Sequence, residues 1–402
     1  MSRNAEEWAR APALPADHFI SSEVYRSEAL FQEEQIRLLN KVWLLACHES
    51  EIPNKGDFRT FNHLDIPMVV IRGDDGVIRT LVNVCSHRSA PVVRTPSGNA
   101  QRLVCFFHLW TYDTQGNCVT QTRDIGYKEV GPPKERSGLR VIRTEVNCGL
   151  VFYNMDDGAG PLDEFLADSL DTLRAALTEQ PLEPFHYHQI EIQANWKQWH
   201  ETNMELYHEW GHPVNRRQGV NSPGYHDRYI TVGKNGHVAL PPYRVAYANL
   251  AGWDNRDQHN FPGMNPGEIR AVDLFPNTSV IIRGTAMRID TSRPIGANRT
   301  LMEFRGIGLK ADTPEVRAIR IRDHNQYWGP FGRTQPEDVF FVEGVERSNR
   351  RAANYSVISR RENFAAHDDA ALRGYYEVWG RYMGRQASAP FDHALPAEVE
   401  GK

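Results

Sequence analysis

The chain has 402 residues, a formal net charge of −5 and five cysteines. This length allows two or three domains with a large buried core. The mixed, slightly acidic charge argues against nucleic-acid or membrane-surface binding, and no apolar run is long enough to span a bilayer. The acidic N-terminus is not typical of a secretory signal, and the cysteines show no disulfide spacing. We therefore expect a cytoplasmic protein.

The N-terminal part predicts a helix followed by a small β domain. Apolar residues at helical spacing predict a helix over 23–43. Short alternating runs from 47 to 78 predict a β-meander, and G-L-V-F-Y-N-M supplies a closing strand near residue 155. An amphipathic segment over 161–178, with acidic residues in its first turn, predicts a linking helix.

Two short motifs within the β domain pair a cysteine with a histidine. Cys85 and His87 form C-x-H, and Cys105 and His108 form C-x-x-H, with seventeen residues between the two motifs. Two thiolates and two imidazoles suit a binuclear iron–sulfur centre, with the cysteines on one iron and the histidines on the other. Zinc is the alternative, but zinc-finger spacing pairs like with like. The mixed order favours a Rieske cluster.

The C-terminal part alternates strands and helices. A strand is expected after Pro184, followed by one helix over 196–212. Further strands precede two helices around 314–323 and 335–348, and an aromatic helix over 370–383 ends the fold.

The predicted helix over 196–212 carries a second candidate metal site. Glu201, Glu205, His208 and His212 step by four, three and four residues, which places them on one helical face. Two histidines one turn apart can chelate a metal. With one carboxylate they make a 2-His-1-carboxylate facial triad, which leaves coordination positions on Fe(II) open for dioxygen. A solvated polar face is the alternative.

The two motifs together resemble the large, catalytic subunit of the Rieske non-haem iron ring-hydroxylating oxygenases, over nearly the whole chain. The family pattern C-x-H-R-G…C-x-x-H-G-W-x-Y is met except at two glycines, which are Ser89 and Leu109 here. The resemblance implies an α+β fold. A small all-β Rieske domain (40–155) would precede a catalytic domain (156–402) whose antiparallel sheet grips helices (helix-grip, START-like). Residues 1–39 would form a helical segment packed on the catalytic domain.

The resemblance also implies the cofactors and their ligands. One [2Fe-2S] cluster per chain would sit on the two cysteines and two histidines of the paired motifs. One mononuclear Fe(II) would be held by His208, His212 and Asp338. In the family the third ligand is a downstream Asp in a helix that begins with an acidic pair, and P-E-D-V-F-F matches it at Asp338. Asp323 is the alternative, but its basic neighbours predict a surface ion pair.

Glu205 takes a separate role by resemblance. Relatives place an acid, usually Asp, three residues before the first iron-binding histidine, where it hydrogen-bonds to a Rieske histidine of the neighbouring subunit, here His108. This pairing implies a ring: a homotrimer, or α3β3 with a small β subunit. The chain has no nicotinamide or flavin motif, so a separate NAD(P)H reductase is expected, possibly with a ferredoxin.

The implied activity is hydroxylation of a small organic substrate with dioxygen, as a mono- or dioxygenase of aromatic catabolism. E-F-R-G-I-G-L and W-G-P-F-G-R are similar to members that act on carboxylates or sulfonates. The alternatives are O- or N-demethylation, a Rieske electron carrier without a second iron, and a zinc-stabilised binding module. Arg283, Arg288 and Arg305 lie on candidate strands, where one could pair with an anion, although outward-facing arginines are commoner. His186 and His188 lack a third ligand.

Overall fold

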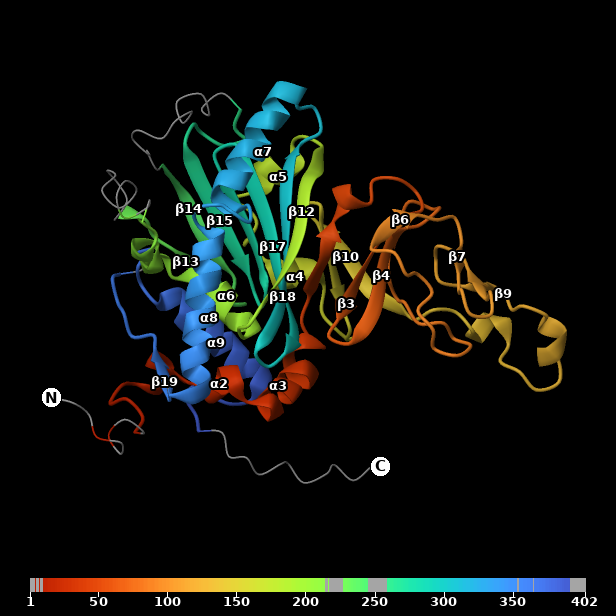
Figure 1. The fold of residues 1–402 in the computed structure, drawn as a ribbon, viewed down its shortest axis with the longest axis horizontal. Helices are drawn as coiled ribbons and strands as arrows, with labels where there is room; N and C mark the ends of the chain where they lie inside the picture. The colour runs from red at the N-terminus through yellow and green to blue at the C-terminus, as the bar shows by residue number, and fades with distance from the viewer. Residues whose placement is uncertain are drawn as a thin grey trace. The chain divides into compact units, whose positions relative to one another are not determined.

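The computed structural model divides into two compact units, residues 40–165 and residues 1–39 together with 166–402 (Figure 1). No described helix is both long and apolar enough to cross a membrane. The residues described are 4, 7, 10–213, 216, 227–244, 259–352, 354–363 and 365–390.

The unit of residues 40–165 is built on a seven-stranded antiparallel sheet in the order β2-β11-β10-β5-β4-β3-β6. A three-stranded sheet, β7-β8-β9, accompanies it. The strands are β2 Leu44–His48, β3 Asp57–His63, β4 Ile66–Arg72, β5 Ile78–Val82, β6 Ser97–Asn99, β7 Leu103–Val104, β8 Thr111–Tyr112, β9 Cys118–Thr120, β10 Val141–Asn147 and β11 Leu150–Asn154. The short helices are η3 Glu49–Glu51, η4 Asp124–Tyr127, η5 Lys134–Arg136 and α4 Leu162–Leu166.

This unit ends about ten residues later than the expected boundary at residue 155. The reason is local pairing. The backbone N–H of Leu162 donates to Glu145 at 2.9 Å, and Asn147 donates to Asp163 at 2.8 Å. These bonds tie the segment after β11 to β10, so it stays with the small β unit.

The larger unit contains a second seven-stranded antiparallel sheet, in the order β12-β18-β17-β16-β15-β14-β13. A two-stranded pair, β1 with β19, lies outside it. The strands are β1 Phe19–Ser21, β12 Leu182–Ile192, β13 Thr231–Val232, β14 Val238–Arg244, β15 Glu268–Leu274, β16 Thr278–Arg283, β17 Ala286–Gly296, β18 Arg299–Leu309 and β19 Tyr355–Val357. The sheet and the helices packed on it give the expected α+β class.

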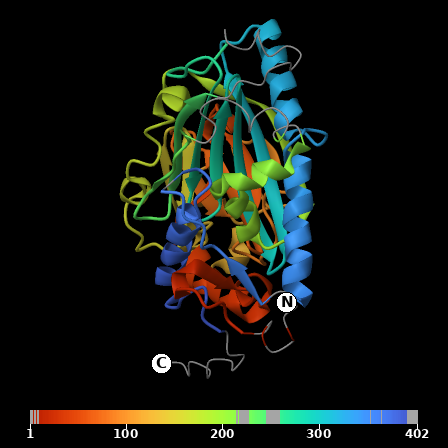
Figure 2. The same ribbon diagram turned by 90° about the vertical axis from the view of Figure 1, so that its left-hand side faces the viewer.

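Helices cover this sheet. Helix α6 contacts β15, β16 and β17, and α7 contacts β17 and β18. Figures 1 and 2 show α7 and α8 following one another along the sheet. The helices are η1 Ala16–His18, α2 Glu23–Arg26, α3 Glu28–Glu34, η2 Gln35–Leu39, α5 Arg174–Thr178, α6 Trp196–Met204, η6 Leu206–Gly211, α7 Pro314–Trp328, α8 Gln335–Arg351 and α9 Ala370–Met383.

Two helices expected as continuous are broken. The segment predicted as one helix over 23–43 is divided at Ser27, whose extended backbone and side chain cap α3, and it ends as a π-helix at Leu39. The segment over 161–178 contains only α4 and α5, with turns between them. Helix α9 matches its predicted range.

A buried polar cluster ties the N-terminal helices to the rest of the larger unit. Glu34 of α3 accepts hydrogen bonds from Lys197 at 2.7 Å, Trp379 at 2.7 Å and Trp196 at 3.1 Å. Lys197 and Glu34 are almost completely buried. A buried ion pair is tolerated where further hydrogen bonds satisfy it, and both indole N–H groups donate here.

Candidate metal centres

The two cysteine–histidine motifs form two loops that close in the same way. The backbone N–H of Ser89 donates to the carbonyl of Cys85 at 2.9 Å, and that of Leu109 donates to the carbonyl of Cys105 at 3.0 Å. Ser89 and Leu109 both adopt a left-handed backbone, with φ of 57° and 59°. These are the two positions where the family pattern has glycine. The loops therefore keep a glycine-type turn despite the side chains, at a cost in backbone strain.

Replacing Leu109 by glycine should stabilise this loop. A residue with a β-carbon costs about 1–2 kcal/mol of folding free energy in a left-handed conformation, and glycine removes this cost. Glycine also destabilises the folded state by about 0.4–1 kcal/mol, because it increases the conformational entropy of the unfolded chain. We expect a net gain of up to about 1.6 kcal/mol, measured as a higher temperature for thermal bleaching of the cluster. Leu109→Ala is the matched control, because it shortens the side chain and keeps the β-carbon. An equal gain in both variants would contradict the strain argument.

The four side chains of the two motifs lie close together and pack against aromatic residues. Cys85 and Cys105 are buried. The rings of His87 and His108 lie 4.6 Å apart, and Trp110 stacks on His87 at 4.8 Å. Burial lowers the pKa of His87, as do His108 and Arg88, so its imidazole is neutral, which is the form that binds metal.

The donor set fits a binuclear cluster better than a single zinc ion. Nδ1 of His87 is buried and has no hydrogen-bond partner among the described residues, as expected of a nitrogen reserved for a metal. Within the described part of the chain, one group of three or more ligands could share a single ion, and it does not include these four residues. Two sulfurs and two nitrogens spread over a wider space suit two irons.

A buried tyrosine contacts one of the cluster cysteines. The hydroxyl of Tyr112 lies 3.1 Å from Sγ of Cys85 and accepts the backbone N–H of Ser86 at 3.1 Å. Hydrogen bonds to cluster sulfurs tune the reduction potential. The W-T-Y segment, which belongs to the family pattern of the second motif, therefore contributes to the centre through the contact of Tyr112 with Cys85.

The second centre lies where α6 ends, and the single helix predicted over 196–212 is wrong. Helix α6 stops at Glu205, whose φ of −116° and ψ of 114° are extended, and the 3₁₀-helix η6 follows. The Glu205 side chain accepts the backbone N–H of His208 at 3.1 Å and so caps η6. The backbone N–H of Leu206 donates to Ala366 at 3.1 Å instead of continuing the helix.

This break changes which residues face one another. Glu201, expected on the same face as the histidines, instead accepts hydrogen bonds from Tyr25 at 3.0 Å and from Tyr376. His208 and His212 converge with Asp338 of α8. Nε2 of His212 lies 3.0 Å from Oδ1 of Asp338, and Nε2 of His208 lies 3.5 Å from the same atom. All three ligand atoms lie within 4.8 Å of one another.

Asp323 does not take part in this centre. The expected ion pair with a basic neighbour is present, but Asp323 itself does not lie at the surface. Its side chain is fully buried on α7, where it accepts a hydrogen bond from Thr285 and pairs with Arg322 at 3.2 Å. The spacing of α7 points Asp323 at the loop between β16 and β17, so only Asp338 reaches the two histidines.

The electrostatics of the three residues suit a cation. Burial alone would raise the pKa of Asp338, but the nearby imidazoles of His208 and His212 lower it to about 2. Burial alone would lower the pKa of His208, but Glu205 and Asp338 raise it well above its ordinary value. The carboxylate is therefore ionised, and the site attracts positive charge. Two imidazoles and one carboxylate are the donors of a non-haem Fe(II) facial triad.

Each of the two histidines is also held by a second carboxylate. Nδ1 of His208 lies 2.9 Å from Glu205, and Nδ1 of His212 pairs with Glu337. A carboxylate at Nδ1 sets the tautomer and leaves Nε2 for the metal. Sequence reasoning missed Glu337. The acidic pair at the start of α8 could have indicated it, but a role was assigned only to the second acid of the pair, Asp338.

A cavity of about 90 Å³ opens beside the three residues, between the sheet and α6, η6 and α8. Arg283 and Arg288 line it and are buried, so they point inward and not outward. Arg305 is also buried but does not line the cavity, and it pairs with Glu303 at 3.2 Å. The cavity is much smaller than the roughly 300–1,000 Å³ typical of drug-sized ligands.

His186 and His188 share a face of β12, as expected, and do not belong to the single-ion group found among the described residues. Nε2 of His186 lies 2.7 Å from Nδ1 of His188, and the other ring nitrogen of His188, Nε2, lies 3.0 Å from Nε2 of Gln335. Burial lowers the pKa of His188 to about 4, and His186 and Arg288 act in the same direction. The pair is therefore neutral and packed.

Asp273 of β15 is a buried carboxyl group near Arg288. Burial raises its pKa to about 7, with a contribution from Asp290, although Ser279 donates a hydrogen bond to it. The native state therefore holds a proton that the unfolded state releases near pH 4. The resulting stability is complete below about pH 4 and is lost as the pH rises to about 7.

Asp273→Asn should remove this pH dependence. For the wild type we expect the free energy of unfolding to fall by on the order of 4 kcal/mol between pH 4 and pH 7 through this group. The asparagine has no proton to lose, so the melting temperature of the variant relative to wild type should rise from pH 5 to pH 8. A difference that stays constant over this range would show that Asp273 titrates normally.

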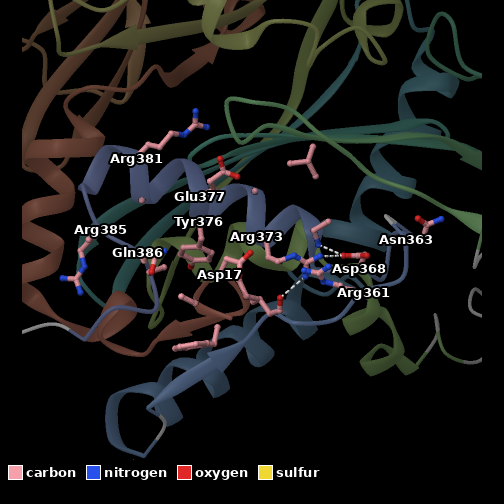
Figure 3. Close-up of a pocket in the computed structure, with 18 residues that line it drawn as sticks. Asp17, Arg361, Asn363, Asp368, Arg373, Tyr376, Glu377, Arg381, Arg385 and Gln386 are labelled. Carbon is pink, nitrogen blue, oxygen red and sulfur yellow. Dashed lines mark hydrogen bonds and ion pairs between the residues drawn. The ribbon is translucent and has the colours of Figure 1, made fainter. Parts of the chain in front are cut away.

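A larger cavity of about 1,100 Å³ lies along α9 in the same unit (Figure 3). Its arginines are engaged by neighbours. Arg373 donates to Asp368 at 2.7 Å, and Arg361 donates to His18 at 2.7 Å. None of its described lining residues belongs to the group that could hold an ion. The size of a cavity therefore does not identify the reaction site in this unit. The convergence of His208, His212 and Asp338 beside the smaller cavity identifies it.

The fold and the two sites define an iron protein with a Rieske unit and a facial-triad unit, and comparisons with known proteins agree. Residues 42–125 match the Rieske [2Fe-2S] domain, and residues 180–385 match the ring hydroxylating alpha subunit catalytic domain. The chain is 40% identical to the alpha subunit of 2-aminobenzenesulfonate 2,3-dioxygenase from Alcaligenes sp., covering 96% of this chain and 99% of that protein. It is 38% identical to the alpha subunit of methanesulfonate monooxygenase hydroxylase from Methylosulfonomonas methylovora, covering 97% of each.

The same architecture occurs in solved structures. Naphthalene 1,2-dioxygenase with indole bound superimposes with a TM-score of 0.78 at 20% identity, covering 95% of this chain and 96% of that one. A quaternary ammonium Rieske monooxygenase gives 0.75 at 22% identity, covering 93% of this chain and all of that one. Because the sequence identities are 20% and 22%, these similarities establish the shared fold only.

The chain belongs to the Rieske non-haem iron ring-hydroxylating oxygenases, as a catalytic alpha subunit. The predicted family, α+β fold, [2Fe-2S] cluster and mononuclear iron are confirmed. It is the terminal oxygenase component, which hydroxylates a small organic substrate with dioxygen. Members of the family receive electrons from a reductase or ferredoxin and assemble as oligomers. The readings as an electron carrier and as a zinc module are therefore wrong.

Proposed function

We propose that this oxygenase hydroxylates a small organic sulfonate. The observation that carries the proposal is the 40% and 38% identity, over almost the whole chain, to two oxygenase subunits whose names specify sulfonates. The cavity supports it, because it is small and Arg283 and Arg288 line it. Arginine is well suited to anionic oxygen groups.

Different residues of the chain would hold the two metal centres and position the substrate. Cys85, Cys105, His87 and His108 would hold the cluster, and His208, His212 and Asp338 would hold the mononuclear iron. The cluster supplies single electrons, and the iron supplies the activation of dioxygen. The protein positions the substrate in a buried cavity and orients both iron-binding histidines through Glu205 and Glu337.

The test is oxygen consumption by the purified protein with NADH and a surrogate reductase. Methanesulfonate, benzenesulfonate and 2-aminobenzenesulfonate are compared with benzoate and acetate at equal concentration. We expect oxygen uptake, and product formation in step with it, only with one or more sulfonates. Uptake coupled to a carboxylate alone would reject the sulfonate assignment. Product analysis distinguishes hydroxylation by one oxygen atom, addition of two, and demethylation.

We further propose that Glu205 pairs with the partner subunit's His108, in a homotrimer or in an α3β3 assembly with a small β subunit. The support is the position of Glu205, three residues before His208 and in contact with it at 2.9 Å. The reductase would draw on NADH or NADPH. The cytoplasmic location stays a prediction.

Mixed oligomers test this arrangement. Cys105→Ser should lack the cluster, and His208→Ala should lack the mononuclear iron, so each variant alone should be inactive. If electrons cross between subunits, co-expressed variants should regain part of the activity, because an intact cluster then serves an intact iron on the next chain. Inactive mixed oligomers of confirmed composition would show that electrons stay within one subunit.

A further inference from the structure

The two arginines of the cavity belong to one face of the sheet. Arg288 of β17 pairs across the strands with Ile281 of β16, and Ile281 pairs with Ala271 of β15. Cross-strand partners share a face, as do residues two apart on one strand. Arg283 therefore lies on the same face as Ile281. The floor of the cavity combines two guanidinium groups with apolar side chains.

Arg288 is held in a fixed orientation. Its Nε donates to Asp290 at 2.8 Å, its Nη2 donates to Asn203 at 3.3 Å, and its guanidinium lies 5.0 Å from the ring centre of Trp328. Asp290 also accepts the indole N–H of Trp199 at 2.8 Å, which fixes the carboxylate in turn. Arg288 itself is 98% buried, being 2% exposed. Such a side chain loses little further freedom when it binds a ligand.

Part of the Arg288 guanidinium remains available to a ligand. Within the described residues, the hydrogen bonds of Arg288 involve Nε and Nη2, and none involves Nη1. Arg288 and Arg283 both line the cavity that contains His208 and Asp338. Asp290 pairs with Arg288 at 2.8 Å, and Arg283 adds a second guanidinium to the lining of the same cavity.

We propose, building on the proposed function, that Arg288 and Arg283 bind the sulfonate group and so direct the carbon atom to be hydroxylated toward the iron ligands. Hydrogen bonds between guanidinium and an anionic oxygen are short and strong, and a planar guanidinium also sets the direction of the anion. The hydrocarbon part of the substrate lies on Ile281 and Ala271. The preferred ligand is therefore a small anion with an apolar body, and a neutral molecule of the same shape binds poorly.

The test compares an anion with a neutral analogue in Arg288→Gln and Arg288→Lys. The wild type should show a much lower KM for methanesulfonate than for dimethyl sulfone. Arg288→Gln should raise the KM for methanesulfonate by about 10- to 100-fold and leave the value for dimethyl sulfone within about twofold. Arg288→Lys should fall between the two. Arg305→Gln is the matched control, since it removes a buried, ion-paired arginine from the neighbouring strand and outside the cavity.

Iron content and direct binding complete the test. Each variant is compared at equal mononuclear iron, and binding is read from the change that methanesulfonate causes in the EPR spectrum of the nitric oxide complex of the Fe(II) protein. If Arg288→Gln does not fold, Arg283→Gln replaces it with the same expected loss. Wild-type activity on methanesulfonate with an unchanged KM in the variant would overturn this inference alone. A wild type that oxidises none of the sulfonates would overturn the proposed function, and this inference with it.

Discussion

His208→Ala protein should purify with about two irons per chain where the wild type has about three, and it should not hydroxylate any substrate. The imidazole is one of three donors whose ligand atoms lie within 4.8 Å of one another, and the other two cannot retain iron in competition with water. The absorbance and EPR signals of the reduced cluster should be unchanged, because its ligands belong to the other compact unit. His212→Ala and Asp338→Ala should behave alike.

His186→Ala is the control for this experiment. It removes a histidine from the same unit that contacts His188 at 2.7 Å and lies outside the proposed group of iron ligands. It should keep its mononuclear iron, even if the melting temperature falls. Full iron content and turnover in His208→Ala would refute the assignment of the centre.

Glu205→Gln should keep both metal centres and lower the steady-state rate by about 10- to 100-fold. Glutamine has the same shape and can still accept the backbone N–H of His208, so η6 should remain capped. It lacks the negative charge that pairs with Nδ1 of His208 at 2.9 Å. If Glu205 links the two centres, the loss should lie in the transfer of electrons from the reduced cluster.

Stopped-flow measurement of cluster reoxidation by dioxygen in the presence of substrate checks this directly. Reoxidation should slow in Glu205→Gln in proportion to the steady-state rate. Glu201→Gln is the matched control, because it alters a carboxylate one turn earlier that contacts Tyr25 and Tyr376 instead of a histidine. Loss of iron from Glu205→Gln, with normal reoxidation per remaining iron, would instead assign Glu205 to holding His208.

Interactions between residues that are close in the chain could be predicted from the sequence. The proposed cluster ligands Cys85 and His87 lie on one short turn, and so do Cys105 and His108, so their spacing sets their geometry within a few residues. His208 and His212 were likewise named from a local interval. These residues could be proposed as metal ligands from the sequence, because donor chemistry and spacing along the chain are both local properties.

Contacts between segments that are distant in the chain could be established only from the tertiary structure. Glu205 ends α6 because Leu206 donates to Ala366, far along the chain, and periodicity alone cannot reveal such a competing hydrogen bond. Asp338 and Glu337 reach the histidines because α8 packs beside α6, whereas Asp323 of α7 is turned toward Thr285. The sequence by itself determined which donor types the chain has and which pairs lie on one turn. The resemblance had already proposed Asp338 over Asp323 as the third iron ligand, and packing brings its carboxylate to the two histidines. Only packing decided that Glu337 reaches His212 and that the arginines face inward, because both depend on how the strands and helices lie against one another.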